Sequence, residues 1–263
     1  MRADTEMKPA LSEKQVNFYH TNGYLVVENV VSHAACDHAI AMYERYAKPD
    51  HRGIMNLYRG TIEYAEGSMV EYVPVDPEDA EFELSLVEHH PIPQMLEELQ
   101  LDEVGLLQTM VLFKKAGTPY QLQSWNPHQD NAYPQARWGA YITGNICFTD
   151  QDVENGCLRM YPGSHRELLL DFEAKKSFHE NAGDRPGHKV EVPPQYSPVD
   201  LPMKKGSVLF LHGNVIHDSY PNVSPTRSRQ MLLIPYITAC VDFIPGRTAK
   251  RTYRPLRKRP PVF

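Results

Sequence analysis

Near the N-terminus, apolar residues recur at helical spacing. Over residues 12–22 and again over 32–48 they return every three or four positions, which predicts two amphipathic helices. Ser12 followed by Gln15 is a capping-box pattern at the start of the first helix. A β-branched and aromatic run over 24–27 predicts a strand between the helices. We interpret this region as a helical layer that covers a sheet.

The next stretch, residues 50–93, shows no clear period because prolines interrupt it. One helix is predicted from Pro77 to Glu88, with the proline in its first turn. The adjacent His89 and His90 point apart on any regular element, so we interpret them as surface histidines rather than metal ligands.

After Leu106 the period becomes that of strands, in short apolar or alternating segments separated by Gly, Pro and Asn turns. The predicted strands are residues 106–113, 120–125, 140–149, 157–161, 207–211 and 231–238. Many short strands behind a helical layer predict a mainly β fold, a double-sheet jelly roll. A polar, proline-rich segment over 163–205 interrupts the strands, and we interpret it as a lid.

We expect the 263 residues to form one domain, with a mainly helical cover over 1–105, a jelly-roll core over 106–240 and a basic tail over 246–263. The net charge is −6, but the tail holds seven basic residues and no acid, so the remainder stands at −13. Basic tails can bind nucleic acid. Because no motif in the chain supports that role, we expect a solvated end or a clamp on the acidic surface.

Cellular location can be predicted from what the sequence lacks. No apolar run approaches the ~20 residues of a membrane span, and the first residues lack the apolar core of a signal peptide. The four cysteines include no Cys-x-x-Cys pair, which is typical of thiols in a reducing compartment. We therefore expect a cytoplasmic protein without a membrane partner.

Two separated patches carry candidate chemistry. In an extended chain, residues i and i+2 share a face, so His128 and Asp130 would aim at one point and could bind one metal ion. His217, on a distant apolar segment, would supply a third ligand. Two histidines and one carboxylate are typical of non-haem iron(II) oxygenases, in which the opposite positions stay open. Arg229 opens another apolar run, where an arginine is costly to bury without an anion.

With these motifs the chain resembles the phytanoyl-CoA dioxygenase (PhyH) family of iron(II)- and 2-oxoglutarate-dependent oxygenases. The resemblance covers most of the chain, through Phe18-Tyr19-x-x-Asn22-Gly23-Tyr24, His128-Gln129-Asp130, Glu154-Asn155-Gly156-Cys157-Leu158, Pro162-Gly163-Ser164-His165, His217-Asp218-Ser219-x-Pro221-Asn222 and Arg229. It implies a double-stranded β-helix, a cupin-like jelly roll. It also implies Fe(II) as cofactor, 2-oxoglutarate and O2 as cosubstrates, and ascorbate as a reductant in vitro.

Residue by residue, the resemblance implies that His128, Asp130 and His217 bind the iron. Arg229 matches the arginine that holds the distal carboxylate of 2-oxoglutarate, and Ser219 matches a hydroxyl that assists it. The interval from His217 to Arg229 is one residue longer than usual, which leaves Arg227 as an alternative anchor.

Trp125 and Asn145 match positions that line the cosubstrate site in relatives. Trp125 could equally be a core aromatic, and Asn145 could satisfy backbone groups near a strand end. We interpret His212 as structural, His165 as a hydrogen-bonding residue, and His179 and His188 as solvated.

The expected function is oxidation, by hydroxylation first, of an aliphatic C–H bond in a small polar metabolite or an intermediate of secondary metabolism, with release of succinate and CO2. In this superfamily, halogenases lack the carboxylate that Asp130 provides, so halogenation is disfavoured. Desaturation, epimerisation and ring formation use the same triad and stay open. The alternatives are an inactive metal-binding jelly roll and a zinc hydrolase. Tyr133, Arg137 and Trp138 are the candidate substrate-binding residues.

Overall fold

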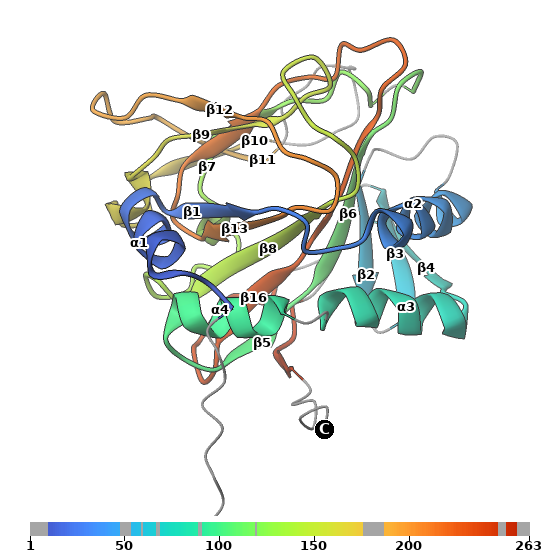
Figure 1. Ribbon diagram of the computed structural model, residues 1–263, viewed down its shortest axis with the longest axis horizontal. Coiled ribbons are helices and arrows are strands. Elements are labelled where there is room, and N and C mark those ends of the chain that lie inside the picture. Colours follow the sequence, from blue (N-terminus) through green and yellow to red (C-terminus); the bar gives the residue numbers. More distant parts are fainter. Residues whose placement is uncertain are drawn as a thin grey trace, which may run out of the picture.

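A computed structural model of the protein describes residues 10–47, 54–58, 60–66, 69–88, 91–118, 120–175, 187–246 and 251–256. Within these ranges two antiparallel sheets lie face to face, and four helices cover the outer face of the larger sheet (Figure 1). The helices are α1 (Glu13–Asn22), α2 (His33–Tyr46), α3 (Pro77–Val87) and α4 (Ile92–Gln100). A mainly β jelly roll with an N-terminal helical layer is therefore confirmed.

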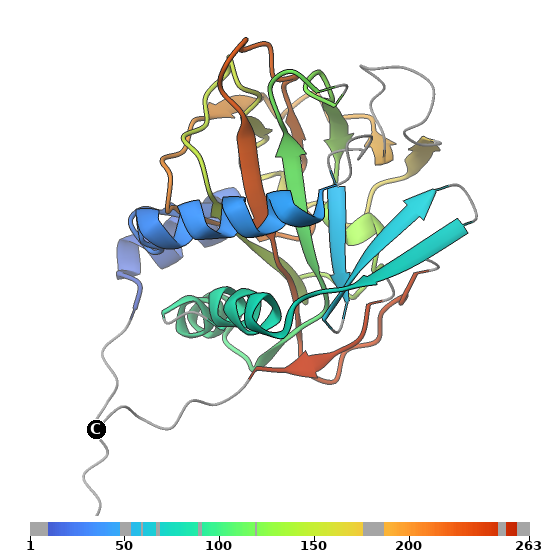
Figure 2. The same ribbon diagram turned by 90° about the vertical axis from the view of Figure 1, so that its right-hand side faces the viewer.

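The larger sheet has eleven strands and runs in the order β17-β5-β16-β8-β15-β6-β2-β3-β4, with β13 pairing to β8 and β1 to β13. Its members are β1 (Tyr24–Val27), β2 (Ile54–Tyr58), β3 (Thr61–Glu66), β4 (Met69–Pro74), β5 (Val104–Leu106), β6 (Thr109–Lys114), β8 (Tyr141–Cys147), β13 (Val208–His212), β15 (Arg229–Leu233), β16 (Pro235–Thr238) and β17 (Arg254–Pro255). Figure 2 shows α2 and α3 on one side of this sheet, with β2, β3 and β4 at its end.

The smaller sheet has the order β12-β9-β14-β7 and carries the metal-binding motifs. Its strands are β7 (Trp125–His128), β9 (Leu158–Met160), β12 (Val199–Leu201) and β14 (His217–Ser219). β7 is an edge strand, and Pro127 within it has no backbone N–H to offer a further neighbour. Beside β7 lies β11 (Gly187–Val190), which pairs with β10 (Phe172–Lys175).

Alternation along β13 shows how the larger sheet divides two cores. Val208 and Phe210 pack among the helices, in one cluster with residues of α1, α2, α3 and α4. Leu209 and Leu211 point the other way and pack with Leu158 and other residues between the sheets. The period of two in a strand separates these faces, so a side chain's place in the register tells which core it enters.

The helical layer forms where the sequence predicts it. The Ser12 hydroxyl accepts from the backbone N–H of Gln15, and the Gln15 side chain accepts from the Ser12 N–H, which completes the capping box. Gly23 ends α1 at a φ of 83°, a left-handed conformation that glycine adopts without strain. Within the described ranges, no helix has the length and apolar character needed to cross a bilayer.

Several predicted boundaries are wrong. Residues 120–122 form a turn, 123 and 124 are irregular, and the strand begins only at Trp125. The stretch without a clear period forms β2, β3 and β4, so the cover over 1–105 is not only helical. Their sequences carry no clear period-two alternation, so periodicity alone did not identify these strands.

The segment predicted as a lid contains β10, β11, β12 and a 3-10 turn, η2 (Ser164–Arg166), in its described parts. Residues 176–186 lie outside the described ranges, as do His89, His90 and most of the basic tail. The lid role and the domain limits stay predictions.

Candidate metal centre

Strand register brings the two histidines together. In the smaller sheet β14 pairs with β7, and His217 lies directly opposite His128. Directly opposed residues share a face, with Cβ atoms about 5 Å apart. The ring centroids of the two imidazoles are 4.3 Å apart.

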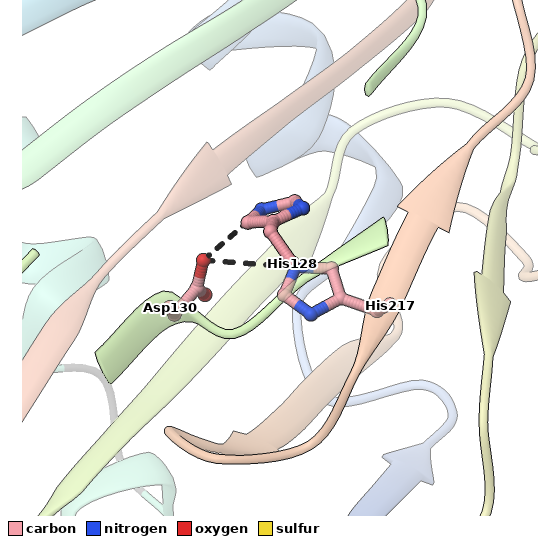
Figure 3. A group of neighbouring side chains, drawn as sticks. All are labelled: His128, Asp130 and His217. Atoms are coloured by element: carbon pink, nitrogen blue, oxygen red, sulfur yellow. Dashed lines mark ion pairs between the residues drawn. The ribbon is translucent and has the colours of Figure 1, made fainter. Parts of the chain in front are cut away.

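Asp130 joins them from a turn rather than from the strand. β7 ends at His128, and Asp130 opens the 3-10 turn η1 (Asp130–Ala132). The prediction that His128 and Asp130 share one strand face is therefore wrong in its geometry. The tight turn nevertheless returns the carboxylate to the imidazoles, as Figure 3 shows.

The spacing of the three side chains fits a metal ion. Asp130 Oδ1 lies 3.4 Å from His128 Nε2 and 3.6 Å from His217 Nε2, and all the ligand atoms lie within 4.8 Å of one another. Ligands at about 2.1 Å from one ion are about 3.0–3.4 Å apart at right-angled to tetrahedral geometry. Among the described residues, no other group of three or more His, Cys, Asp and Glu side chains brings its ligand atoms so close together.

Backbone carbonyls set the orientation of both imidazoles. His128 Nδ1 lies 2.7 Å from Asn126 O, and His217 Nδ1 lies 3.2 Å from Val215 O. A carbonyl can only accept, so each Nδ1 carries the proton and each Nε2 offers its lone pair at the metal position.

Without a metal, the triad shares its protons unequally. Burial opposes charge on His128, but the hydrogen bond and charge of Asp130 outweigh it and raise the pKa of His128. Burial and then the charge of His128 lower the pKa of His217 to about 4. Burial alone would raise the pKa of Asp130, yet the two imidazoles lower it overall. A metal cation would displace the proton held between His128 and Asp130.

Buried amides beside the triad hold η1 in place. Gln129 donates to Leu168 O and Asn214 O and accepts from the Leu170 N–H. Asn131 donates to Asn214 Oδ1 and Ala136 O and accepts from the Ala136 N–H. Asn214 donates to Glu167 O. We call Gln129, Asn131 and Asn214 the amide cluster; each of its side chains both donates and accepts.

A second set of buried polar side chains lies on the inner face of the larger sheet. Arg229 is fully buried; its Nε donates to Gln151 Oε1 and its Nη2 lies 2.9 Å from the Met231 sulfur. In the described part of the chain, Arg229 Nη1, Gln151 Nε2 and Asn145 Oδ1 have no hydrogen-bond partner. Burial lowers the pKa of Arg229 to about 10. We call Lys114, Asn145, Gln151 and Arg229 the inter-sheet polar group.

The two candidate anchor arginines differ sharply in their surroundings. Arg227 is 40% exposed in its side chain and pairs with both Asp152 and Glu154. Arg229 is buried and bonds to the Gln151 side chain and the Met231 sulfur, and among the described residues its Nη1 has no partner. A buried guanidinium without a carboxylate partner is the group that fits an incoming anion.

Ser219 shares the inner face of β14 with His217. These two residues lie opposite Leu158 and Met160 of β9, both in the core between the sheets. The Ser219 hydroxyl accepts a hydrogen bond of 2.8 Å from Lys114 Nζ. Sequence reasoning missed Lys114, although a lysine that ends an apolar strand is the same signal that identified Arg229.

Asp218, between His217 and Ser219, faces the other side of β14. Arg159 binds both of its carboxylate oxygens, at 2.7 and 2.6 Å, and the Tyr161 hydroxyl donates to it as well. Asp218 is therefore committed to a fork-to-fork ion pair that holds β14 against β9.

The remaining predicted site residues lie in two places. Tyr133 stacks on His188 of β11, with the ring centroids 4.4 Å apart. Burial and then the charge of Asp130 raise the pKa of Tyr133 to about 12. The Trp125 ring centroid lies 6.1 Å from that of His128. His188 packs against Phe172 as well, so the prediction that it is solvated is wrong.

Trp138 lies elsewhere. Its indole donates to His165 O, and its ring packs against His212 at 5.1 Å. His212 is buried, and burial together with the charges of His165 and His20 lowers its pKa to about 3. Arg137 is exposed. The substrate-binding role of Arg137 and Trp138 stays a prediction.

Comparison with known proteins agrees with this geometry. A family model described as phytanoyl-CoA dioxygenase (PhyH) matches residues 19–231. A phytanoyl-CoA dioxygenase of Arabidopsis thaliana is 32% identical over 126 residues, which cover 45% of this chain and 40% of that protein. Phytanoyl-CoA dioxygenase 1 of Oryza sativa is 23% identical over 86% of this chain and 90% of its own length.

Solved structures share the fold. The epimerase SnoN, in complex with Fe3+, α-ketoglutarate and nogalamycin RO, is 21% identical and has a TM-score of 0.66 over 93% of this chain and 95% of its own. The carbocyclase SnoK is 23% identical, with a TM-score of 0.66 over 91% of this chain and 88% of its own. A non-heme monooxygenase, ThoJ, has a TM-score of 0.66 at 19% identity, over 87% of this chain and 79% of its own.

Proposed function

The chain belongs to the phytanoyl-CoA dioxygenase family of iron(II)- and 2-oxoglutarate-dependent oxygenases, and from this premise we propose that it hydroxylates an aliphatic C–H bond of a small polar metabolite or natural-product intermediate. The observation that carries the proposal is the combination of an iron-type triad with a buried arginine whose Nη1 has no partner in the described part of the chain. Bound iron(II) supplies O2 activation coupled to the decarboxylation of 2-oxoglutarate to succinate and CO2.

The protein's own residues would orient and protect this chemistry. His128, Asp130 and His217 hold one face of the ion and leave the other face for ligands. Arg229 holds the distal carboxylate of 2-oxoglutarate, and the Ser219 hydroxyl assists it. Asn145 and Trp125 would border the cosubstrate. Tyr133 and His188, close to the triad, would border the substrate.

Epimerisation or ring formation is the second candidate reaction. An epimerase and a carbocyclase are among the solved structures of this fold. The same triad would serve either reaction. We propose a cytoplasmic location, because the four cysteines have the spacing that is typical of thiols in a reducing compartment.

The decisive experiment is succinate release from 2-oxoglutarate by the Fe(II)-loaded protein with ascorbate, over a panel of small polar metabolites. Product mass then separates the reactions: hydroxylation adds one oxygen, desaturation removes two hydrogens and epimerisation changes nothing. A protein that binds Fe(II) but neither binds nor turns over 2-oxoglutarate would be an inactive metal-binding jelly roll. Turnover with Zn(II) but not Fe(II) would indicate a hydrolase.

A further inference from the structure

Two buried cationic side chains lie side by side on neighbouring strands of the larger sheet. Lys114 of β6 lies directly opposite Arg229 of β15, so both side chains occupy the inner face. Lys114 is 3% exposed and Arg229 is 0% exposed. Like charges placed directly opposite are destabilising, and more so without solvent. A fold that keeps this pair gains from an anion placed beside it.

The charges of this pair are not balanced by nearby acids. Asp218, the one carboxylate whose charge acts on the Lys114 amine among the described residues, gives both of its oxygens to Arg159. Among the described residues, the hydrogen-bond partners of Lys114 are neutral oxygens. Burial and then the charge of Arg229 lower the pKa of the Lys114 amine well below its usual value. An anion nearby would offset both effects.

In its charged form, which an adjacent anion favours, Lys114 has no hydrogen left for a ligand. Its Nζ donates to Gly156 O, Ser219 Oγ and Tyr220 O, which accounts for all three protons of an ammonium group. Two of these acceptors are carbonyls, which cannot donate in return. Because Ser219 Oγ accepts from Lys114, its own hydroxyl proton must be donated elsewhere.

Close packing keeps the lysine in this position. Gly156 has a φ of +91°, and a Cβ at Gly156 would lie 2.9 Å from Tyr220 O and 3.1 Å from Lys114 Cδ. The Asn155 side chain fixes this turn through bonds to Asp150 O and Ser228 O. The lysine stem therefore runs through a space that only glycine leaves open.

We propose that Lys114 is a positioning residue that commits the Ser219 hydroxyl to donate to the distal carboxylate of 2-oxoglutarate, while its charge joins that of Arg229 in holding the carboxylate. The inference rests on the proposed function. Lys114 would act from the larger sheet on a residue of the smaller sheet, and so would tie the cosubstrate site to the distance between the two sheets.

The test compares two ligands of the anaerobic Fe(II)-loaded protein by calorimetry. 2-Oxoglutarate has the distal carboxylate, whereas oxalate chelates the metal without one. Lys114→Met should weaken 2-oxoglutarate binding about tenfold or more and leave oxalate binding within about twofold. Lys115→Met is the matched control, because Lys115 is exposed and pairs with Glu44. It should change neither affinity.

A double variant tests the route through the hydroxyl. If Lys114 acts through Ser219, then Lys114→Met should weaken 2-oxoglutarate binding much less in a Ser219→Ala background than alone. Full additivity, an unchanged affinity in Lys114→Met, or an equal loss of oxalate binding would each overturn the inference. Failure of the unaltered protein to bind 2-oxoglutarate contradicts the proposed function instead.

Should Lys114→Met not fold, Ser219→Ala alone carries the test. It removes a hydroxyl and adds no bulk. It should weaken 2-oxoglutarate and spare oxalate, and an unchanged affinity for 2-oxoglutarate overturns the proposal.

Discussion

The amide cluster and the inter-sheet polar group are both buried, yet they treat their hydrogen-bonding capacity in opposite ways. In the amide cluster, Gln129, Asn131 and Asn214 exchange bonds with one another and with backbone. In the inter-sheet polar group, Arg229, Gln151 and Asn145 each keep an atom without a partner in the described part of the chain. Unpaired buried polar atoms are costly, so a fold keeps them where a ligand pairs them.

The comparison teaches which buried polar residues serve shape and which serve binding. The amide cluster should matter for stability and little for the affinity of 2-oxoglutarate. The inter-sheet polar group should show the reverse. The metal triad, which the amide cluster supports, should matter for activity above all.

The largest effect is expected at the triad. Asp130→Ala removes the carboxylate that both imidazoles face, so Fe(II) binding and succinate release should fall by at least about 10³-fold. Metal content after anaerobic reconstitution and succinate yield measure this. Asp152→Ala, on the surface beside Arg227, is the control. Full activity in Asp130→Ala would mean that the triad is not the metal site.

Arg229→Met should come next. Losing the buried guanidinium that would hold the distal carboxylate should weaken 2-oxoglutarate binding by roughly 100-fold. The free energy of unfolding of the ligand-free protein should stay level or rise, because an unpaired buried charge has been replaced by an apolar side chain. Titration of 2-oxoglutarate and urea denaturation measure the two effects.

Arg227→Met is the matched control for that variant. Its guanidinium pairs with acids at the surface, and exposed pairs contribute little. If Arg227→Met loses affinity and Arg229→Met does not, the assignment of the anchor is reversed.

Asn131→Ala should have the reverse effects of Arg229→Met, with a loss of stability and little change in the affinity for 2-oxoglutarate. It leaves Asn214 Oδ1 and both backbone groups of Ala136 without partners, so the free energy of unfolding should fall by about 2–3 kcal/mol. The affinity of the folded protein for 2-oxoglutarate should change by less than about threefold. A large loss of affinity at full stability would break the distinction between the two groups.

Glu83 in α3 belongs to neither the amide cluster nor the inter-sheet polar group, and its effect on stability should be smaller than that of Asn131. It is buried, accepts from the Thr109 hydroxyl, and burial raises its pKa to about 7. A pKa raised on folding adds stability that is complete below the unfolded value and lost as the pH rises through the folded value. The free energy of unfolding should therefore fall by about 1 kcal/mol between about pH 6 and pH 8.

Glu83→Gln should remove this slope, as urea midpoints at the two pH values would show. The buried His212, with its lowered pKa, acts in the opposite sense and at lower pH, below about 6.5. An identical slope in both proteins would mean that Glu83 ionises freely in the folded state.

Local patterns allowed the main features to be predicted. The capping box at Ser12 forms as expected, and the strands predicted over 140–149, 157–161 and 207–211 appear within a few residues of their limits. His128, Asp130 and His217 do lie together, as motif spacing and the family resemblance implied. These signals are short-range or reside in a few residues of special chemistry.

What sequence reasoning missed depends on pairing across the fold. The turn that carries Asp130 is held by Asn214, more than eighty residues away, so no local pattern shows it. The role proposed for Lys114 depends on its position opposite Arg229 on the neighbouring strand, and sequence alone does not supply that register. The strands β2, β3 and β4 likewise form by successive pairing rather than by a strong pattern of their own: β2 pairs with β6, β3 with β2 and β4 with β3.

The position of β7 at the sheet edge has a consequence for how this enzyme could change over time. Pro127 prevents a further strand from adding to that edge, and edge strands without such protection invite aggregation. β11, which lies along it, thus has no ladder to maintain with β7. It can be lengthened or replaced while both sheets keep their register. Because we propose that His188 of β11 borders the substrate, substrate preference can diverge there at little structural risk, and libraries intended to redirect the enzyme would best begin with β11.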